Sequence, residues 1–259
     1  MKKNNKFLIL FLIIVIFVII LIINKKYLFE IFANIFNSFQ RTLIDEDRYI
    51  LILQGLKSTL IISFTSILFG TLIGIALFML RISKFKVLST ISKIIINVLR
   101  GMPITVLLLI FYYVIFGKIN INPIIVAIIT FSLYFSAYTS EIFRGAYLSL
   151  NKSQIISSYA LGFNKIQTIH YIVLPQILTY IIPVFKNESV SLVKLTSIAG
   201  YISIMDLTKA SDIIRNRTYE AFFPLIFTSL LYYLICYLYI KILNILYKKI
   251  NPRKEKKYE

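Results

Sequence analysis

The chain has 259 residues, of which 58% are hydrophobic and only 15% are charged. Globular domains average about 45–50% apolar and about 25% charged residues, so a water-soluble fold of this composition would lack polar residues to cover its surface. The apolar content also excludes disorder, and one cysteine and one histidine exclude a disulfide scaffold and a closed zinc site. The composition therefore predicts a membrane protein.

Six segments are apolar enough to cross a membrane, for which a helix needs about 20 residues. The first, Phe7 to Ile23, follows three lysines and carries no charge. It is longer than the apolar region of a signal peptide and no small-residue cleavage site follows it, so we interpret it as an uncleaved signal-anchor helix. The others are expected at roughly 55–80, 91–116, 123–144, 169–194 and 222–247. The expected fold class is all-α, a polytopic membrane protein of about six transmembrane helices.

Three parts of the chain differ in composition. Residues 1–50 combine the anchor with a mixed-charge external linker, residues 51–247 form a five-helix core, and residues 248–259 form a cationic tail. Within the core, Ser66, Gly70 and Gly74 place small side chains four apart on one helical face, which lets a second helix approach closely.

The net charge of +18 suggests nucleic acid at first sight, but its distribution follows membrane topology. With both termini in the cytoplasm, sixteen basic residues fall on the inner side and nine on the outer side, as the positive-inside rule requires. Anionic lipid of the inner leaflet is a sufficient partner for this charge. We expect a multi-pass protein of a bacterial-type plasma membrane and no nucleic-acid ligand.

The internal loop after Arg144 contains a short helix that cannot span the membrane. Asn151 is a suitable N-cap and Gly162 a suitable left-handed residue after the last turn. A small apolar stripe runs along it, and Asn164 can cap the next helix. The stripe comprises Ile155, Ile156, Tyr159 and Ala160. Such a helix either docks on a partner protein or lies against its own bundle or lipid headgroups.

The run from Tyr159 to Pro175 resembles the cytoplasmic loop signature of ATP-binding-cassette importer permeases. In that signature a glycine precedes nine residues, an isoleucine, one residue and Leu-Pro, which matches Gly162, Ile172 and Leu174-Pro175. An ordered set of further short matches is similar to the polar amino acid branch of the family, typified by transporters of histidine, glutamine and arginine. They include Gly55-Leu56, Arg81-Ile82-Ser83, Arg100-Gly101 with Pro103, Ala137-Tyr138, Glu141-Ile142, Arg144-Gly145, Gln154, Ala160-Leu161-Gly162, Pro183 with Asn187, and Lys194 with Thr196-Ser197.

The resemblance implies that this loop is the coupling helix, which sits in a groove on an ATPase subunit. The implied coupling residues are Ser153, Gln154, Ile156, Ser157, Ser158, Tyr159, Ala160, Leu161, Gly162, Leu174 and Pro175. Ile156, Ser157 and Ser158 replace the usual Glu-Ala-Ala, which removes one possible charged contact with the ATPase.

The energy for transport must come from another chain. No phosphate-binding Gly-x-x-x-x-Gly-Lys-Ser/Thr loop occurs, so no cofactor is expected on this chain, and ATP with magnesium is expected on the ATPase. The chain is therefore expected to be non-catalytic. The implied partners are ATPase subunits, an extracytoplasmic substrate-binding protein and a second permease subunit, identical or related. Lipid surrounds them.

Charged residues at membrane depth are costly and usually face the interior of the bundle. Arg100, Gly101, Pro103 and Lys194 are candidate pathway residues. The Arg100 guanidinium either meets a substrate carboxylate near a helix interruption or extends to the headgroups.

Two further sets of charges are expected to neutralise each other. Glu141 and Arg144 are three residues apart and favour a structural ion pair over a substrate role. Lys186, Glu188 and Lys194 are expected to satisfy one another around Pro183.

Two alternatives to an importer permease remain at this point. An ion-coupled secondary transporter would use carboxylates deep in the membrane and inverted repeats, and neither is evident in the sequence. A membrane assembly protein would not need a capped docking helix together with the ordered matches.

Overall fold

The computed structural model describes residues 25–250, and this part of the chain is helical with no β-strand. The expected anchor helix over Phe7 to Ile23 and residues 251–259 of the expected tail lie outside the described residues. In chain order the elements are α2 (Lys25–Phe39), η1 (Gln40–Ile44), η2 (Asp45–Asp47), α3 (Tyr49–Arg81), α4 (Lys86–Gly101), α5 (Ile104–Leu109), η3 (Ile110–Ile115), α6 (Pro123–Leu148), α7 (Lys152–Ala160), α8 (Lys165–Thr168), η4 (Ile169–Val173), α9 (Leu174–Leu195), η5 (Thr196–Ile202), α10 (Leu207–Thr218) and α11 (Phe222–Ile250).

Within residues 25–250, four helical stretches are long and apolar enough to cross a membrane: Tyr49–Arg81, Pro123–Leu148, Lys165–Ile202 and Phe222–Ile245. A fifth crossing is present if the bent pair α4 and α5–η3 counts as one span. The segment expected to span at 91–116 is interrupted near Pro103, where its two halves, Lys86–Gly101 and Ile104–Ile115, meet at 105°. Pro103 has no N–H and disfavours helical geometry in the residue before it, and Met102 is accordingly extended, with φ −96° and ψ 139°.

Helices α3 and α6 form the centre of the bundle and approach each other closely. A Cβ atom on Gly70 would lie 2.8 Å from the carbonyl oxygen of Ser132, and one on Gly74 would lie 2.8 Å from Cβ of Thr139. Ser66 belongs to the same face and donates from Oγ to the carbonyl of Ile128 at 3.3 Å. The small-residue stripe therefore does what its spacing predicts, because only residues without bulky side chains fit between the two backbones.

Asp206 is the N-cap of α10, which begins at Leu207. The carboxylate accepts the backbone N–H groups of Thr208 and Lys209 at 2.9 and 3.1 Å. Burial raises the pKa of the Asp206 carboxyl above its ordinary value, although these hydrogen bonds oppose the rise. Apolar residues of α10 form a second core with residues of η1 and α3: Leu43, Ile52, Leu207, Ala210 and Ile214.

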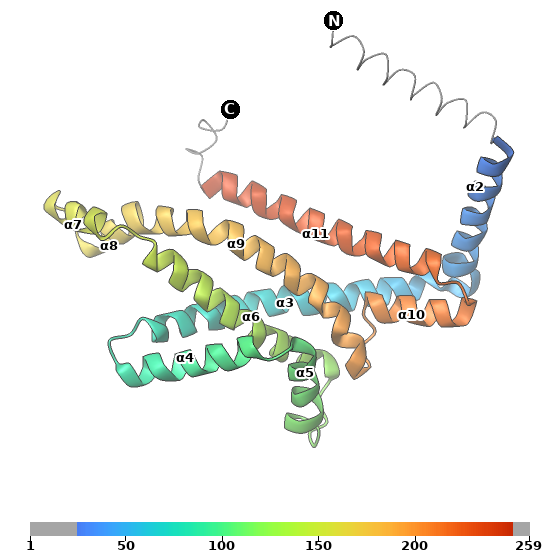
Figure 1. The fold of residues 1–259 in the computed structure, drawn as a ribbon, viewed down its shortest axis with the longest axis horizontal. Coiled ribbons are helices and arrows are strands. Elements are labelled where there is room, and N and C mark those ends of the chain that lie inside the picture. Colours follow the sequence, from blue (N-terminus) through green and yellow to red (C-terminus); the bar gives the residue numbers. More distant parts are fainter. Residues whose placement is uncertain (1–24, 251–259) are drawn as a thin grey trace, which may run out of the picture.

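The helices run roughly side by side between two ends of the molecule (Figure 1). Helices α7 and α8 lie at one end, where α3 ends, α4 begins and α11 ends. Helices α2 and α10 lie at the opposite end. The basic residues Arg81, Lys86 and Lys165 lie at the α7 end, because they stand at the adjoining ends of α3, α4 and α8.

Candidate functional site

Helix α7 has defined caps at both ends. Asn151 Oδ1 accepts the backbone N–H of Ser153 at 3.0 Å, which confirms the predicted N-cap. Gly162 has φ +84°, and its N–H donates to the carbonyl of Tyr159 at 3.0 Å. The N–H of Phe163 donates to the carbonyl of Ser158 at 3.0 Å, which completes a Schellman motif. The short helix is thus closed by hydrogen bonds encoded in its own sequence.

Helix α8 turns back on α7 and is joined to it by side chains. Asn164 and Gln167 form a reciprocal capping box, with both hydrogen bonds at 2.9 Å. The hydroxyls of Ser158 and Thr168 are buried and lie 2.9 Å apart, which connects the two helices. These contacts give a rigid unit, residues 151–168, which we call the α7–α8 hairpin.

The α7–α8 hairpin exposes large apolar side chains on its outer surface. The exposed fractions are 68% for Ile156, 49% for Tyr159, 78% for Leu161 and 78% for Ile166. Adjoining exposed apolar side chains of this kind mark sites of interaction. We call these four residues the hairpin apolar face.

Two of the sequence-predicted coupling residues make contacts within the chain, and most of the set is exposed. Ser158 is buried, and Gln154 accepts a hydrogen bond of 2.6 Å from Gln176 of α9, so both hold the hairpin in place. Within the predicted apolar stripe, Ile155 is half-buried, whereas Ile156, Tyr159 and Ala160 are exposed. The exposed members of the predicted set are Ser153, Gln154, Ile156, Ser157, Tyr159, Ala160, Leu161, Gly162, Leu174 and Pro175.

The break between α4 and α5 carries three of the candidate pathway residues. Arg100 and Gly101 are the last residues of α4, and Pro103 precedes the first residue of α5. The Cζ atom of Arg100 lies 5.1 Å from the ring centroid of Tyr138 on α6, a cation–π distance. The hydroxyl of Tyr138 accepts a hydrogen bond of 3.2 Å from the hydroxyl of Tyr134, one turn away. The i, i+4 spacing of these tyrosines places them on one face of α6, but nothing in the sequence alone indicates their contact with Arg100.

The predicted ion pair on α6 is present. Arg144 Nε and Nη2 donate to Oε2 of Glu141 at 2.9 and 2.7 Å. Arg81 Nε of α3 lies 4.0 Å from the other carboxylate oxygen. The pair therefore joins α3 to α6 near the α7 end of the molecule, a geometry suited to a structural contact.

The expected neutralisation among Lys186, Glu188 and Lys194 is wrong. Lys186 Nζ donates to Asn244 Oδ1 of α11 at 2.6 Å. Over residues 25–250, no lysine or arginine nitrogen lies within 4.0 Å of the Glu188 carboxylate. Residues two or six apart on a helix do not face each other, which explains the failure.

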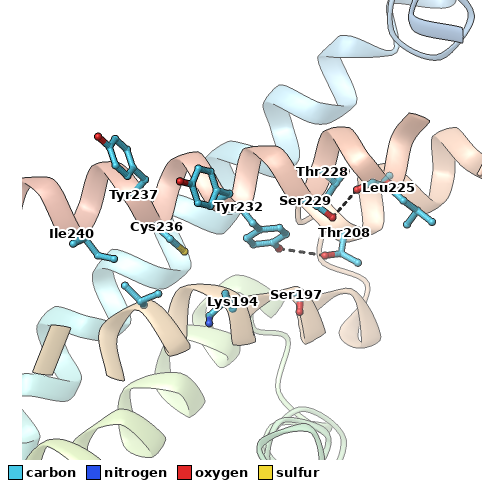
Figure 2. A pocket seen from close by; sticks show the side chains of 13 residues that line it. Lys194, Ser197, Thr208, Leu225, Thr228, Ser229, Tyr232, Cys236, Tyr237 and Ile240 are labelled. Atoms are coloured by element: carbon cyan, nitrogen blue, oxygen red, sulfur yellow. Dashed lines mark hydrogen bonds between the residues drawn. The ribbon is translucent and has the colours of Figure 1, made fainter. Parts of the chain in front are cut away.

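Lys194 lines a cavity of about 680 Å³ between α9–η5, α10 and α11. Figure 2 shows Lys194 and Ser197 on one wall and Tyr232 and Cys236 on the facing helix. The Arg100 side chain does not line this cavity, so the structure does not unite the two candidate pathway cations in one pocket.

Within the described part of the chain, no three His, Cys, Asp or Glu side chains are grouped as metal ligands would be. The geometry defines a bundle of membrane-spanning length with a rigid, apolar hairpin at one end and a helix interruption that carries an exposed arginine. These features are those of the membrane component of a transporter that works with a partner chain.

The chain belongs to the family of binding-protein-dependent transport system inner membrane components, whose model matches residues 66–256. It is therefore a multi-pass inner membrane protein and a non-catalytic permease subunit of an importer, in which ATP hydrolysis belongs to a partner. This membership favours the importer over the secondary transporter and the assembly protein. The family works with an ATPase and a substrate-binding protein.

Individual relatives are similar over most of the chain. The probable amino-acid ABC transporter permease protein YckA of Bacillus subtilis is 35% identical over 199 residues, which cover 76% of this chain and 88% of that protein. A putative glutamine transport system permease protein GlnP of Rickettsia bellii is 31% identical over 206 residues, covering 78% of this chain and 94% of its own. The crystal structure of an amino acid ABC transporter with histidines matches with a TM-score of 0.69 and 28% identity, covering 77% of this chain and 94% of that chain.

Proposed function

We propose that this chain forms the membrane pathway of an amino acid importer and is driven by an ATPase that binds the α7–α8 hairpin. The observation that carries the proposal is the hairpin apolar face, held rigid by two caps and the Ser158–Thr168 contact. Relatives described as amino-acid and glutamine permeases support the cargo class.

The charges support one orientation of the chain. Arg81, Lys86 and Lys165 lie at the α7 end, and basic residues favour the cytoplasmic side. We therefore propose that the α7 end faces the cytoplasm, that both termini are cytoplasmic, and that α2 and α10 face outward toward a binding protein. A second permease subunit, identical or related, completes the pathway within the lipid bilayer, and ATP with magnesium binds only to the ATPase.

We propose that the α4–α5 break lines the pathway. Arg100 is exposed in the single chain, and its guanidinium offers paired donors to a substrate carboxylate. Gly101 has open space around it, and Pro103 maintains the interruption. Lys194, in the separate cavity beside α11, is proposed as a second cationic position along the route.

A substitution in the hairpin apolar face tests the docking proposal. Ile156→Ser removes an exposed apolar side chain from α7, and Val87→Ser makes a comparable change on α4 at the same end of the molecule, where Val87 is 70% exposed. An apolar anchor of an interface contributes about 1–2 kcal/mol or more, so Ile156→Ser should weaken ATPase binding about tenfold. Co-purification with the ATPase and ATP-driven uptake in vesicles measure the effect. Equal behaviour of the two variants would contradict docking through this face.

A further inference from the structure

A cavity at the side of the bundle combines apolar walls with one cation and several hydroxyl groups. It is the cavity of about 680 Å³ between α9–η5, α10 and α11, which we call the α9–α11 cavity. Its volume falls within the range of about 300–1,000 Å³ that is usual for ligand pockets. Leu225, Tyr233 and Tyr237 are exposed members of its lining, so the cavity is open along a membrane-spanning helix.

The lining of the α9–α11 cavity changes from polar to apolar along its length (Figure 2). Hydroxyl groups lie toward the α10 end: Ser197, Thr208, Ser211, Thr228 and Ser229. Apolar and aromatic side chains and one thiol lie toward the middle of the spans: Val190, Cys236, Tyr237 and Ile240. From Leu225 to Ile240 the lining covers about 22 Å along α11, at 1.5 Å per residue. One leaflet of a bilayer contains roughly 15 Å of hydrocarbon, so the cavity is long enough for an acyl chain and the polar group attached to it.

Three polar groups of this lining have no partner within residues 25–250. The ammonium group of Lys194 forms no ion pair within 4.0 Å. The hydroxyl oxygens of Ser211 and Thr228 are buried and have no hydrogen-bond partner. A cation at membrane depth without a counter-ion and a buried hydroxyl without a hydrogen bond are both unfavourable. One anion with several acceptor oxygens can satisfy all three groups.

The carboxylate of Asp206 is not the counter-ion of Lys194. It accepts the backbone N–H groups of Thr208 and Lys209, and the hydroxyl of Tyr232 donates to it at 3.4 Å. Asp206 does not line the cavity, and among the lining residues in the described part of the chain Lys194 alone is charged. An anion in the cavity therefore meets a cation and no carboxylate in the lining.

We propose that the α9–α11 cavity binds an anionic phospholipid. Lys194 holds the phosphate, the hydroxyls of Ser211 and Thr228 donate to phosphate or ester oxygens, and an acyl chain lies along the apolar end. The inference requires only a membrane protein and does not depend on the cargo. A cargo carboxylate can reach Lys194 only after the phosphate has left, so the lipid controls access to this position.

Native mass spectrometry of the delipidated permease with its ATPase, in mild detergent, measures lipid binding directly. Phosphatidylglycerol is the probe, and phosphatidylcholine, which has the same phosphate but no net charge, is the comparison. The wild-type complex should bind phosphatidylglycerol about fivefold to tenfold more tightly, the contribution of one lysine beside an anionic lipid. Glycerol 3-phosphate, which has no acyl chain, should not displace it at equal concentration, because burial of the chain supplies much of the binding free energy.

Substitutions in the lining should change the preference between the two lipids. Lys194→Met should abolish the preference for phosphatidylglycerol, and Lys194→Arg should keep it. Ser211→Ala should weaken phosphatidylglycerol binding about twofold to tenfold, the value of one hydrogen bond. Lys209→Met, the same change at an exposed lysine of α10 outside the cavity, should alter nothing.

Three results would contradict the lipid site. They are equal binding of the two phospholipids by the wild type, a preference that survives in Lys194→Met, and displacement by glycerol 3-phosphate at equal concentration. A second permease subunit seated in the cavity would also contradict it. A photoreactive benzoylphenylalanine in place of Tyr233 should therefore form adducts with phospholipid, whereas covalent permease dimers would overturn the proposal. Amino acid uptake tests the proposed function separately, since none of these results bears on the cargo.

Discussion

Replacement of Gly162 by alanine isolates the backbone contribution to the α7–α8 hairpin. Gly162 has φ +84°, and a Cβ atom added there would meet no heavy atom within 4 Å. The substitution therefore creates no steric clash, and its whole cost is that of holding an L-residue in a left-handed conformation. That cost is about 1–2 kcal/mol, which favours the open hairpin about 5- to 30-fold.

Hydrogen exchange of two backbone amides measures this cost. The N–H groups of Gly162 and Phe163 donate to the carbonyls of Tyr159 and Ser158, and exchange requires these bonds to open. Gly162→Ala should accelerate both exchange rates about 5- to 30-fold and weaken ATPase binding by a similar factor. The effect should appear in the permease with or without its ATPase.

Gly145→Ala provides the matched control. Gly145 lies within α6, is exposed, and also has no heavy atom within 4 Å of an added Cβ, but its φ is not positive. Alanine is the better helix former by about 1 kcal/mol, so this variant should be as stable as the wild type or more so. Unchanged exchange at Phe163 in Gly162→Ala would refute the reasoning, because the left-handed cap would then not hold the hairpin closed.

Three other substitutions test separate parts of the fold. Glu141→Gln leaves Arg144 and Arg81 without their carboxylate and should lower the free energy of unfolding by roughly 1 kcal/mol, a modest value because these side chains are partly exposed; thermal unfolding in detergent measures it. Gly70→Ala places a Cβ 2.8 Å from a backbone oxygen of α6 and should lower the free energy of unfolding by about 1–3 kcal/mol in the same assay. Gly145→Ala, which meets no heavy atom within 4 Å, should cause no such loss. Because burial raises the pKa of Asp206, its neutral form is favoured on folding. The Asp206 carboxyl therefore raises the free energy of unfolding at pH values below its ordinary pKa, and this contribution is lost as the pH rises through the raised pKa. Asp206→Asn should keep the cap and flatten the dependence of the free energy of unfolding on pH. An unchanged pH profile in this variant would contradict the role given to Asp206.

The local features of the hairpin could be predicted from the sequence because each depends on neighbouring residues. Asn151 and Asn164 accept backbone N–H groups two or three residues ahead, and Gly162 adopts the positive φ that follows many helices. The glycine stripe on α3 was also predictable, since its four-residue spacing fixes one face whatever the partner helix.

Features that depend on packing between distant segments could not be predicted in this way. Pro103 signals an interruption, but nothing local sets the 105° angle between the two halves. Lys194 lines the cavity beside α11, and Ser158 is buried against Thr168. Both positions depend on how whole helices pack against each other. The same is true of Glu188, whose missing counter-ion becomes visible only when α4, α6 and α9 are assembled.

Uptake by vesicles that contain the purified permease, its ATPase and its binding protein tests the central claim most directly. The account predicts amino acid accumulation that requires ATP on the side of the α7–α8 hairpin and binding protein on the opposite side, and that persists when ion gradients are abolished. Uptake by this chain alone, driven by a proton or sodium gradient without nucleotide, would contradict it.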